Sequence, residues 1–142
     1  MNTSAYKADS EGNVADLSSA DNVEVVNAAR VLTKADSGKV LSLKNATGVR
    51  IDLPTPTKGF KLKVLVGLAF ATSNFTVVAQ SNIIQGGATV NGAFVPAEDE
   101  NTISFVATAE KVGDFIELVS DGTNYFVSGN ASGAGAITFT AP

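Results

Sequence analysis

The stretch that most constrains the fold is residues 60–70, FKLKVLVGLAF. Successive side chains of an extended strand point to opposite faces, and here one face is wholly apolar. The other face begins with Lys61 and Lys63 and ends with small or apolar residues. This pattern predicts a central strand of a β-sandwich whose first half meets water on one side and whose second half is covered on both sides.

The rest of the chain alternates in shorter pieces. It predicts strands at residues 23–26, 29–33, 39–43, 49–53, 74–79, 82–85, 88–90, 93–95, 102–106, 114–120, 124–128 and 136–140. Turn signals predict hairpins that pair 39–43 with 49–53, 88–90 with 93–95 and 114–120 with 124–128. Between the strands we expect an interruption at Gly86-Gly87, a loop at 96–101, one helical turn at 107–112 and a linker at 129–135. No internal repeat is visible. We therefore predict an all-β fold, a β-sandwich or jelly roll of about ten short antiparallel strands.

Residues 1–22 are polar and small, and they carry few large apolar side chains. Such a segment buries too little surface to offset its ordering entropy. We interpret it as an extended N-terminal arm that precedes a β-sandwich domain at 23–142. It is either a disordered terminus or an arm that orders only against a neighbouring subunit or a larger surface. Tyr6 is an unusual aromatic there and, with Lys7, is predicted to bind a partner, although chance placement explains it as well.

Composition narrows the possible functions. The chain has no Cys and no His, which removes disulfides, thiolate metal sites and Ser-His-Asp triads. A formal charge of −4 disfavours a nucleic-acid binder. The first residues lack the features of a secretory signal, and no apolar run approaches the length of a membrane span. We expect no nucleic-acid partner and no membrane contact.

Carboxylates are the remaining source of chemistry. Glu98, Asp99 and Glu100 are consecutive, so they read as a solvated loop more readily than as a calcium site. Asp114, Glu117 and Asp121 lie on or beside one predicted hairpin and raise the alternative of a glycosidase-like pair, without a Trp to stack a sugar. We predict no catalytic residue, metal, cofactor or small-molecule substrate, and hence no enzyme.

Charge is divided between two parts of the chain. Residues 34–63 hold seven basic residues against two acidic ones, a formal charge of +5, whereas residues 98–121 hold seven acidic residues against one basic one, a formal charge of −6. Opposite halves either face each other within a subunit or complement each other between identical subunits. We favour the second use. It predicts these partner-binding residues within the domain: Arg50, Lys61, Lys63, Glu110 and Glu117.

Four stretches carry a resemblance to known proteins: LTKADSGKVLSL at 32–43, VRIDLPTPTKGFKLKVLV at 49–66, NIIQGG at 82–87 and VGDFIELVSDGTNYFVSG at 112–129. They resemble a family of head decoration (cement) proteins of tailed bacteriophages, with related fibre domains. The last stretch is the most specific. Tyr125 departs from the family pattern, where Trp is expected, and residues 1–31 are not matched.

The resemblance implies a virion structural protein, assembled in the host cytoplasm, that binds the outside of the phage head. It also implies a homotrimer whose partner is the major capsid protein and which reinforces contacts between capsid subunits. An alternative is a receptor-binding or fibre-tip domain in which loops at 85–100 contact a host surface glycan.

Overall fold

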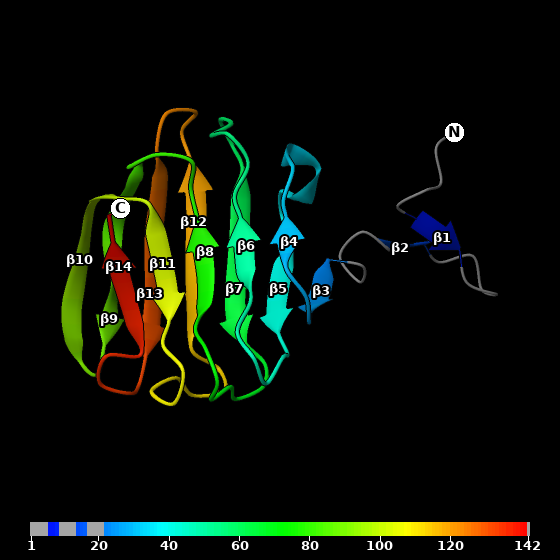
Figure 1. Cartoon of the computed structure of the whole chain (residues 1–142). Coiled ribbons are helices and arrows are strands. Elements are labelled where there is room, and N and C mark those ends of the chain that lie inside the picture. Colours follow the sequence, from blue (N-terminus) through cyan, green and yellow to red (C-terminus); the bar gives the residue numbers. More distant parts are fainter. Residues whose placement is uncertain (1–5, 9–13, 17–21, 142) are drawn as a thin grey trace.

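The computed structural model describes residues 6–8, 14–16 and 22–141, and strands dominate these segments. Figure 1 shows two layers of strands in the main body. The strands are β1 (Tyr6–Ala8), β2 (Val14–Asp16), β3 (Val23–Val26), β4 (Arg30–Val31), β5 (Val40–Leu43), β6 (Arg50–Asp52), β7 (Lys61–Val66), β8 (Phe75–Val78), β9 (Ile84–Val90), β10 (Ala93–Glu100), β11 (Thr102–Phe105), β12 (Phe115–Ser120), β13 (Tyr125–Ala131) and β14 (Ile137–Thr140). A short 3₁₀ helix, η1, covers Lys34–Asp36.

Two mixed sheets make up the β-sandwich. The seven-stranded sheet has the order β10-β9-β13-β12-β7-β5-β3, and the five-stranded sheet has the order β14-β11-β8-β6-β4. The all-β sandwich predicted from the sequence is confirmed. None of the described helices is long and apolar enough to cross a membrane.

The chain from β3 to β8 winds back and forth between the two sheets. β3, β5 and β7 are parallel neighbours in one sheet, and β4, β6 and β8 are parallel neighbours in the other. The expected hairpin of 39–43 with 49–53 is therefore wrong, and the sheets are not purely antiparallel. Leu43 and Ile51 are both fully buried. Their strands lie in opposite sheets and both side chains enter the core between them. A hairpin within one sheet would bury both equally well, so alternation alone does not distinguish the two pairings.

The winding is a structural repeat that the sequence does not show. Val23 stands opposite Val40, and Val40 stands opposite Lys63. Val23, Val40 and Lys63 thus occupy the same position on successive strands of one sheet. They are unevenly spaced along the chain and differ in residue type, so the sequence shows no regular repeat.

The second half of the chain completes both sheets mainly with antiparallel strands. The β12–β13 hairpin and the Asn91-Gly92 turn between β9 and β10 are confirmed. Gly86 and Gly87 do not end a strand, because β9 runs through them with φ of 112° and 149°. The loop expected at 96–101 is also wrong, since β10 continues to Glu100. Residues 107–112 form turns rather than a helical turn, and β13 extends into the expected linker.

Apolar side chains from both sheets fill the space between them. Leu41, Val64 and Ile116 are aligned across β5, β7 and β12, and all three are fully buried. The strand β7 ends at Val66, and Gly67 follows it where a side chain would collide with the Ser42 hydroxyl. Lys61 and Lys63 face outward, as the alternation predicts.

Near the N-terminus, β1 and β2 pair with each other in an antiparallel two-stranded sheet, with Lys7 opposite Ala15. The predicted partner-binding side chains of Tyr6 and Lys7 lie outside the described part of the structure, so these predictions stay open.

Candidate functional site

Three of the predicted partner-binding residues meet on the outer face of the seven-stranded sheet, the face turned away from the five-stranded sheet. Lys61 and Lys63 come from β7, and Glu117 comes from the neighbouring strand β12. Glu117 stands opposite Lys63, and the Lys63 Nζ lies 4.0 Å from the Glu117 Oε1. The same Nζ lies 4.7 Å from the centroid of the Phe115 ring. Lys63 is therefore held by an ion pair and a cation–π contact, whereas Lys61 projects beside them.

A shallow depression of about 220 Å³ lies beside these residues. Its lining includes Val40 of β5, Lys61 and Lys63 of β7, and Val119 of β12. Pockets for drug-sized molecules are typically about 300–1,000 Å³ and largely enclosed. The size and openness of this depression suit one side chain of another protein better than a small-molecule substrate.

Large apolar side chains are exposed on the same face. Phe126 of β13 is 44% exposed and Val119 of β12 is 45% exposed. Phe94 of β10 reaches 66%, and Val23 and Val25 of β3 are also exposed. Single exposed apolar residues are ordinary, but several on one sheet face mark a surface suited to protein contact.

Strand registers align four residues in one line across this face, near the end of the sheet that carries the β12–β13 turn. Gln85 of β9 stands opposite Phe126 of β13, Phe126 opposite Val119 of β12, and Val119 opposite Lys61 of β7. The next strand beyond Gln85 is β10, and its acidic residue Asp99 accepts a 2.6 Å hydrogen bond from the Gln85 amide. We call Asp99, Gln85, Phe126, Val119 and Lys61 the cross-sheet row.

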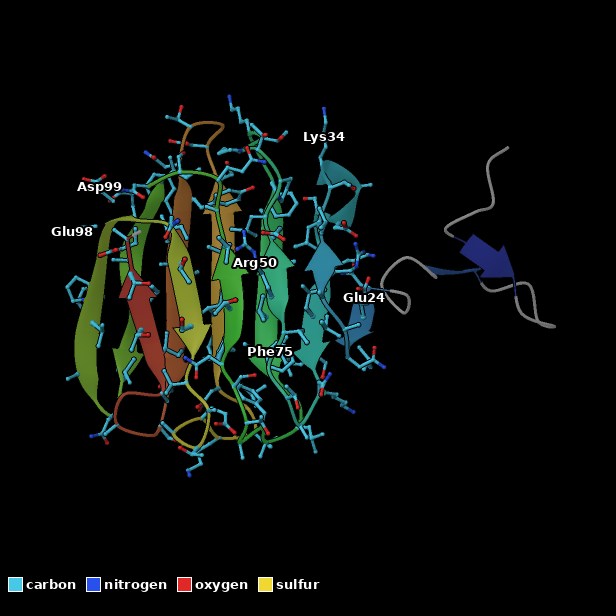
Figure 2. The ribbon with its side chains drawn as sticks, in the orientation of Figure 1. Glu24, Lys34, Arg50, Phe75, Glu98 and Asp99 are labelled. Carbon is cyan, nitrogen blue, oxygen red and sulfur yellow. The ribbon has the colours of Figure 1, made fainter. Side chains whose placement is uncertain are left out.

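The acidic end of this row is built by an irregularity in β10. The register of β10 against β9 shifts between Ala97 and Glu100, and Asp99 has a φ of 56°. Gln85 bonds the Asp99 carboxylate, and the Asp99 amide donates to the Gln85 side-chain oxygen at 3.3 Å. Figure 2 shows Glu98 and Asp99 together at the β10 side of the sandwich, far across the molecule from Glu24 and Lys34.

The other two predicted residues of the domain lie elsewhere. Arg50 is on β6 in the five-stranded sheet, where its guanidinium pairs with Asp52 at 2.7 Å. Glu110 is only 4% exposed, and its Oε1 accepts a 2.9 Å hydrogen bond from the Phe70 amide. Glu110 thus fixes the loop around Phe70 from inside the fold, so the structure does not place it on the partner surface.

A cluster of charges that the sequence did not predict lies at the β3–β4 end of the core. Glu24 stands opposite Leu41, and Arg30 stands opposite Ile51. In-register parallel neighbours point to the same side of a sheet. A charged pair on β3 and β4 therefore occupies the inward positions that are apolar on the next strands.

Four side chains of this cluster form a closed ring of ion pairs: Glu24, Arg30, Asp36 and Lys39. Arg30 Nε lies 2.8 Å from Glu24 and its Nη2 lies 2.9 Å from Asp36, while Lys39 Nζ lies 2.8 Å from each carboxylate. Asp36 also accepts a 2.8 Å hydrogen bond from the Thr33 amide, which caps η1. The ring covers the end of the apolar core with satisfied polar groups.

The ring holds both carboxylates ionised. Hydrogen bonds from Arg30 and Lys39 lower the pKa of Glu24 to about 2. Burial raises the pKa of Asp36, but hydrogen bonds from Lys39 and the Thr33 amide and the charge of Arg30 outweigh it, so this pKa lies below its usual value. Because its charges are mutually paired, the ring is a structural element rather than a ligand site.

Two of the three carboxylates considered for a hydrolytic pair, Asp114 and Asp121, bind backbone amides, whereas Glu117 pairs with Lys63. Asp114 is buried and accepts hydrogen bonds from the Lys111 and Ser132 amides. Asp121 accepts bonds from the Thr123 and Asn124 amides in the β12–β13 turn, which lower its pKa. Among the described residues, no three acidic side chains are grouped as metal ligands would be.

Comparisons of the chain with protein-family models, with curated proteins and with solved structures found no match.

Proposed function

We propose that this protein is a structural component of a phage head, a decoration protein that binds the outer surface of the shell and stabilises contacts between major capsid proteins. One observation carries the proposal: the outer face of the seven-stranded sheet combines exposed Phe126 and Val119 with the charged groups of Lys61 and Glu117. Aromatic and apolar side chains with charges around them are the usual composition of a protein interface.

The resemblance of residues 32–43, 49–66, 82–87 and 112–129 to cement proteins supports this reading, and so does a β-sandwich built without long helices. The proposal includes a homotrimer as the assembled form. Its partners are two further copies of the chain and the capsid lattice. The role is one of binding and reinforcement rather than catalysis.

The direct test is the binding of purified protein to expanded heads of the corresponding phage that lack it. We expect the protein to sediment with the heads at a fixed number of copies per particle. Heads that carry it should also survive heating or osmotic shock better than bare heads. Absence of binding to expanded heads, with a folded protein confirmed by circular dichroism, would contradict the proposal.

One observation favours the second candidate, a fibre-tip domain that binds a host glycan. Phe94 is 66% exposed and follows the tight Asn91-Gly92 turn, so its ring offers an aromatic surface on which a sugar ring could stack. This function predicts binding of the purified protein to host cells and its loss in Phe94→Ala. Head binding that survives Phe94→Ala, with no cell binding by the wild type, would leave the decoration function.

A further inference from the structure

The cross-sheet row has opposite charges at its two ends and apolar side chains at its centre. Asp99, with Glu98 beside it, marks one end on β10, and Lys61 marks the other on β7. Phe126 and Val119 lie between them. We infer that the outer face of the seven-stranded sheet is the contact between copies of this chain, in which Lys61 of one copy meets the Glu98–Asp99 pair of the next.

Charge complementarity indicates that the outer face of the seven-stranded sheet binds a second copy of this chain. Lys61 has no carboxylate within ion-pair distance among the described residues, whereas the neighbouring Lys63 is paired with Glu117. At the other end, Asp99 is oriented by Gln85 but has no basic partner among the described residues, and Glu98 is exposed. A copy of the same face supplies the missing partner to each end.

The centre of the row supplies the apolar part of the contact. Phe126 and Val119 are nearly half exposed on adjacent strands, and the depression beside Val119 has room for a side chain of the facing copy. Seven strands at about 4.8 Å spacing and about 20 Å length give a face of roughly 600 Å². That is the same order as the about 800 Å² that each partner buries in a stable complex.

The inference rests on the homotrimer of the proposed function and assigns its surface. Three faces around a threefold axis bring their apolar centres together and set each acidic end beside a neighbour's basic end. A twofold pair of the same faces, with rows antiparallel, also matches acid to base. The measured mass decides between these two arrangements, and either one uses this surface.

The experiment compares the solution mass of four charge variants of the full chain by light scattering at low salt. Lys61→Glu and Glu98→Lys place like charges together, so each should raise the dissociation constant about tenfold or more. The combined variant K61E/E98K exchanges the two charges and should restore assembly. Lys34→Glu carries the same charge change on η1, outside the seven-stranded sheet, and should assemble like the wild type.

A second pair of variants tests the apolar centre. Phe126→Ser should shift the mass toward the 14.5 kDa of one chain. Val31→Ser changes a residue that is 68% exposed on β4 in the other sheet, and it should not. Circular dichroism establishes that each variant is folded, and wild-type assembly in about 1 M salt probes the charge contact without any substitution.

Restoration by the exchanged charges supports the inference. Unchanged mass in both single reversals and in Phe126→Ser would overturn it, and so would a wild type that stays monomeric. A dimer that responds to these variants would support the surface but contradict the homotrimer. Head binding is measured separately, so failure of the decoration function is distinguished from failure of this interface.

Discussion

Among single residues, the Glu24 carboxylate and the Tyr125 hydroxyl stabilise the fold through polar contacts beside the apolar core. Glu24 occupies an inward position at the end of the core and is compensated by Arg30 and Lys39. Tyr125 is fully buried, and its hydroxyl donates a hydrogen bond to the Pro54 carbonyl. Buried polar groups stabilise a fold only when their partners are present, so removing either group has a defined cost.

Glu24→Gln should lower the free energy of unfolding at pH 7 by about 1–2 kcal/mol, because a neutral amide breaks the ring of ion pairs. The Glu24 pKa is about 2 in the folded chain and 4.5 ordinarily. Its contribution is therefore fully present above about pH 4.5 and is lost as the pH falls toward 2. Denaturant unfolding between pH 2 and 7 measures this. An unchanged pH slope in the variant would contradict the assignment.

Tyr125→Phe should lower stability by about 1 kcal/mol through loss of the hydroxyl's bond to Pro54, while the ring keeps its edge-on contact with Phe60. Burial raises the pKa of Tyr125 to about 12 from 10. The wild type is therefore predicted to lose this contribution between about pH 10 and 12, because the unfolded chain ionises first. Thermal unfolding at pH 7 and in this range, compared with the variant, checks both statements.

At the scale of strands, the sequence predicted element types better than their partners. Alternation located β7 and the β12–β13 hairpin, because each buries one face and leaves side chains of the other exposed or half-buried. It failed for β5 and β6, whose patterns fit a hairpin and two facing strands equally well. Gly86-Gly87 read as a break because composition does not reveal that the Phe94 ring packs over Gly87.

Gly87→Ala should destabilise the protein by about 2–3 kcal/mol. Its φ is 149°, and a Cβ there would collide with the Val95 carbonyl and the Phe94 ring. Gly92→Asn is the matched control: its φ of 77° suits Asn and its surroundings are open, so it should cost less than about 1 kcal/mol. Equal stabilities of the two variants in urea unfolding would contradict this account of β9.

The candidate site was predicted in part. Lys61, Lys63 and Glu117 were found from charge bias and alternation, since outward positions of a strand are visible in the sequence. The alignment of Phe126 with Val119 and Lys61 was not, because it depends on which strands become neighbours. The Glu24 ring was missed for the same reason: only parallel stacking shows that Glu24 and Arg30 point inward.

In the whole molecule, the uneven distribution of charge along the chain becomes a separation of basic and acidic residues across one sheet face. Basic residues of β7 and acidic residues of β10 lie at opposite parts of one sheet face, and the strands between them expose Phe126 and Val119. Such a face is poorly suited to stand alone in water and well suited to repeat from copy to copy. We therefore expect the predicted homotrimer to form through the outer face of the seven-stranded sheet, where these opposite charges lie.

We predict that the N-terminal arm, residues 1–22, contributes to binding of the phage head. Deleting residues 1–19 should leave the sandwich folded, since the two sheets and the buried apolar residues of segment 22–141 form a core by themselves. It should weaken binding to phage heads about tenfold or more. Head co-sedimentation and circular dichroism of the shortened chain measure these two effects. Binding equal to that of the full chain would remove the arm from the interface while leaving the fold intact.

On this proposal, the outer face of the seven-stranded sheet joins copies of this chain through both charge and apolar contact. The most direct measurement is the light-scattering mass of the wild-type protein at low and at high salt. We predict a mass near three times 14.5 kDa at low salt and a shift toward 14.5 kDa as salt screens Lys61 from its acidic partners. A mass of 14.5 kDa under both conditions would contradict the claim.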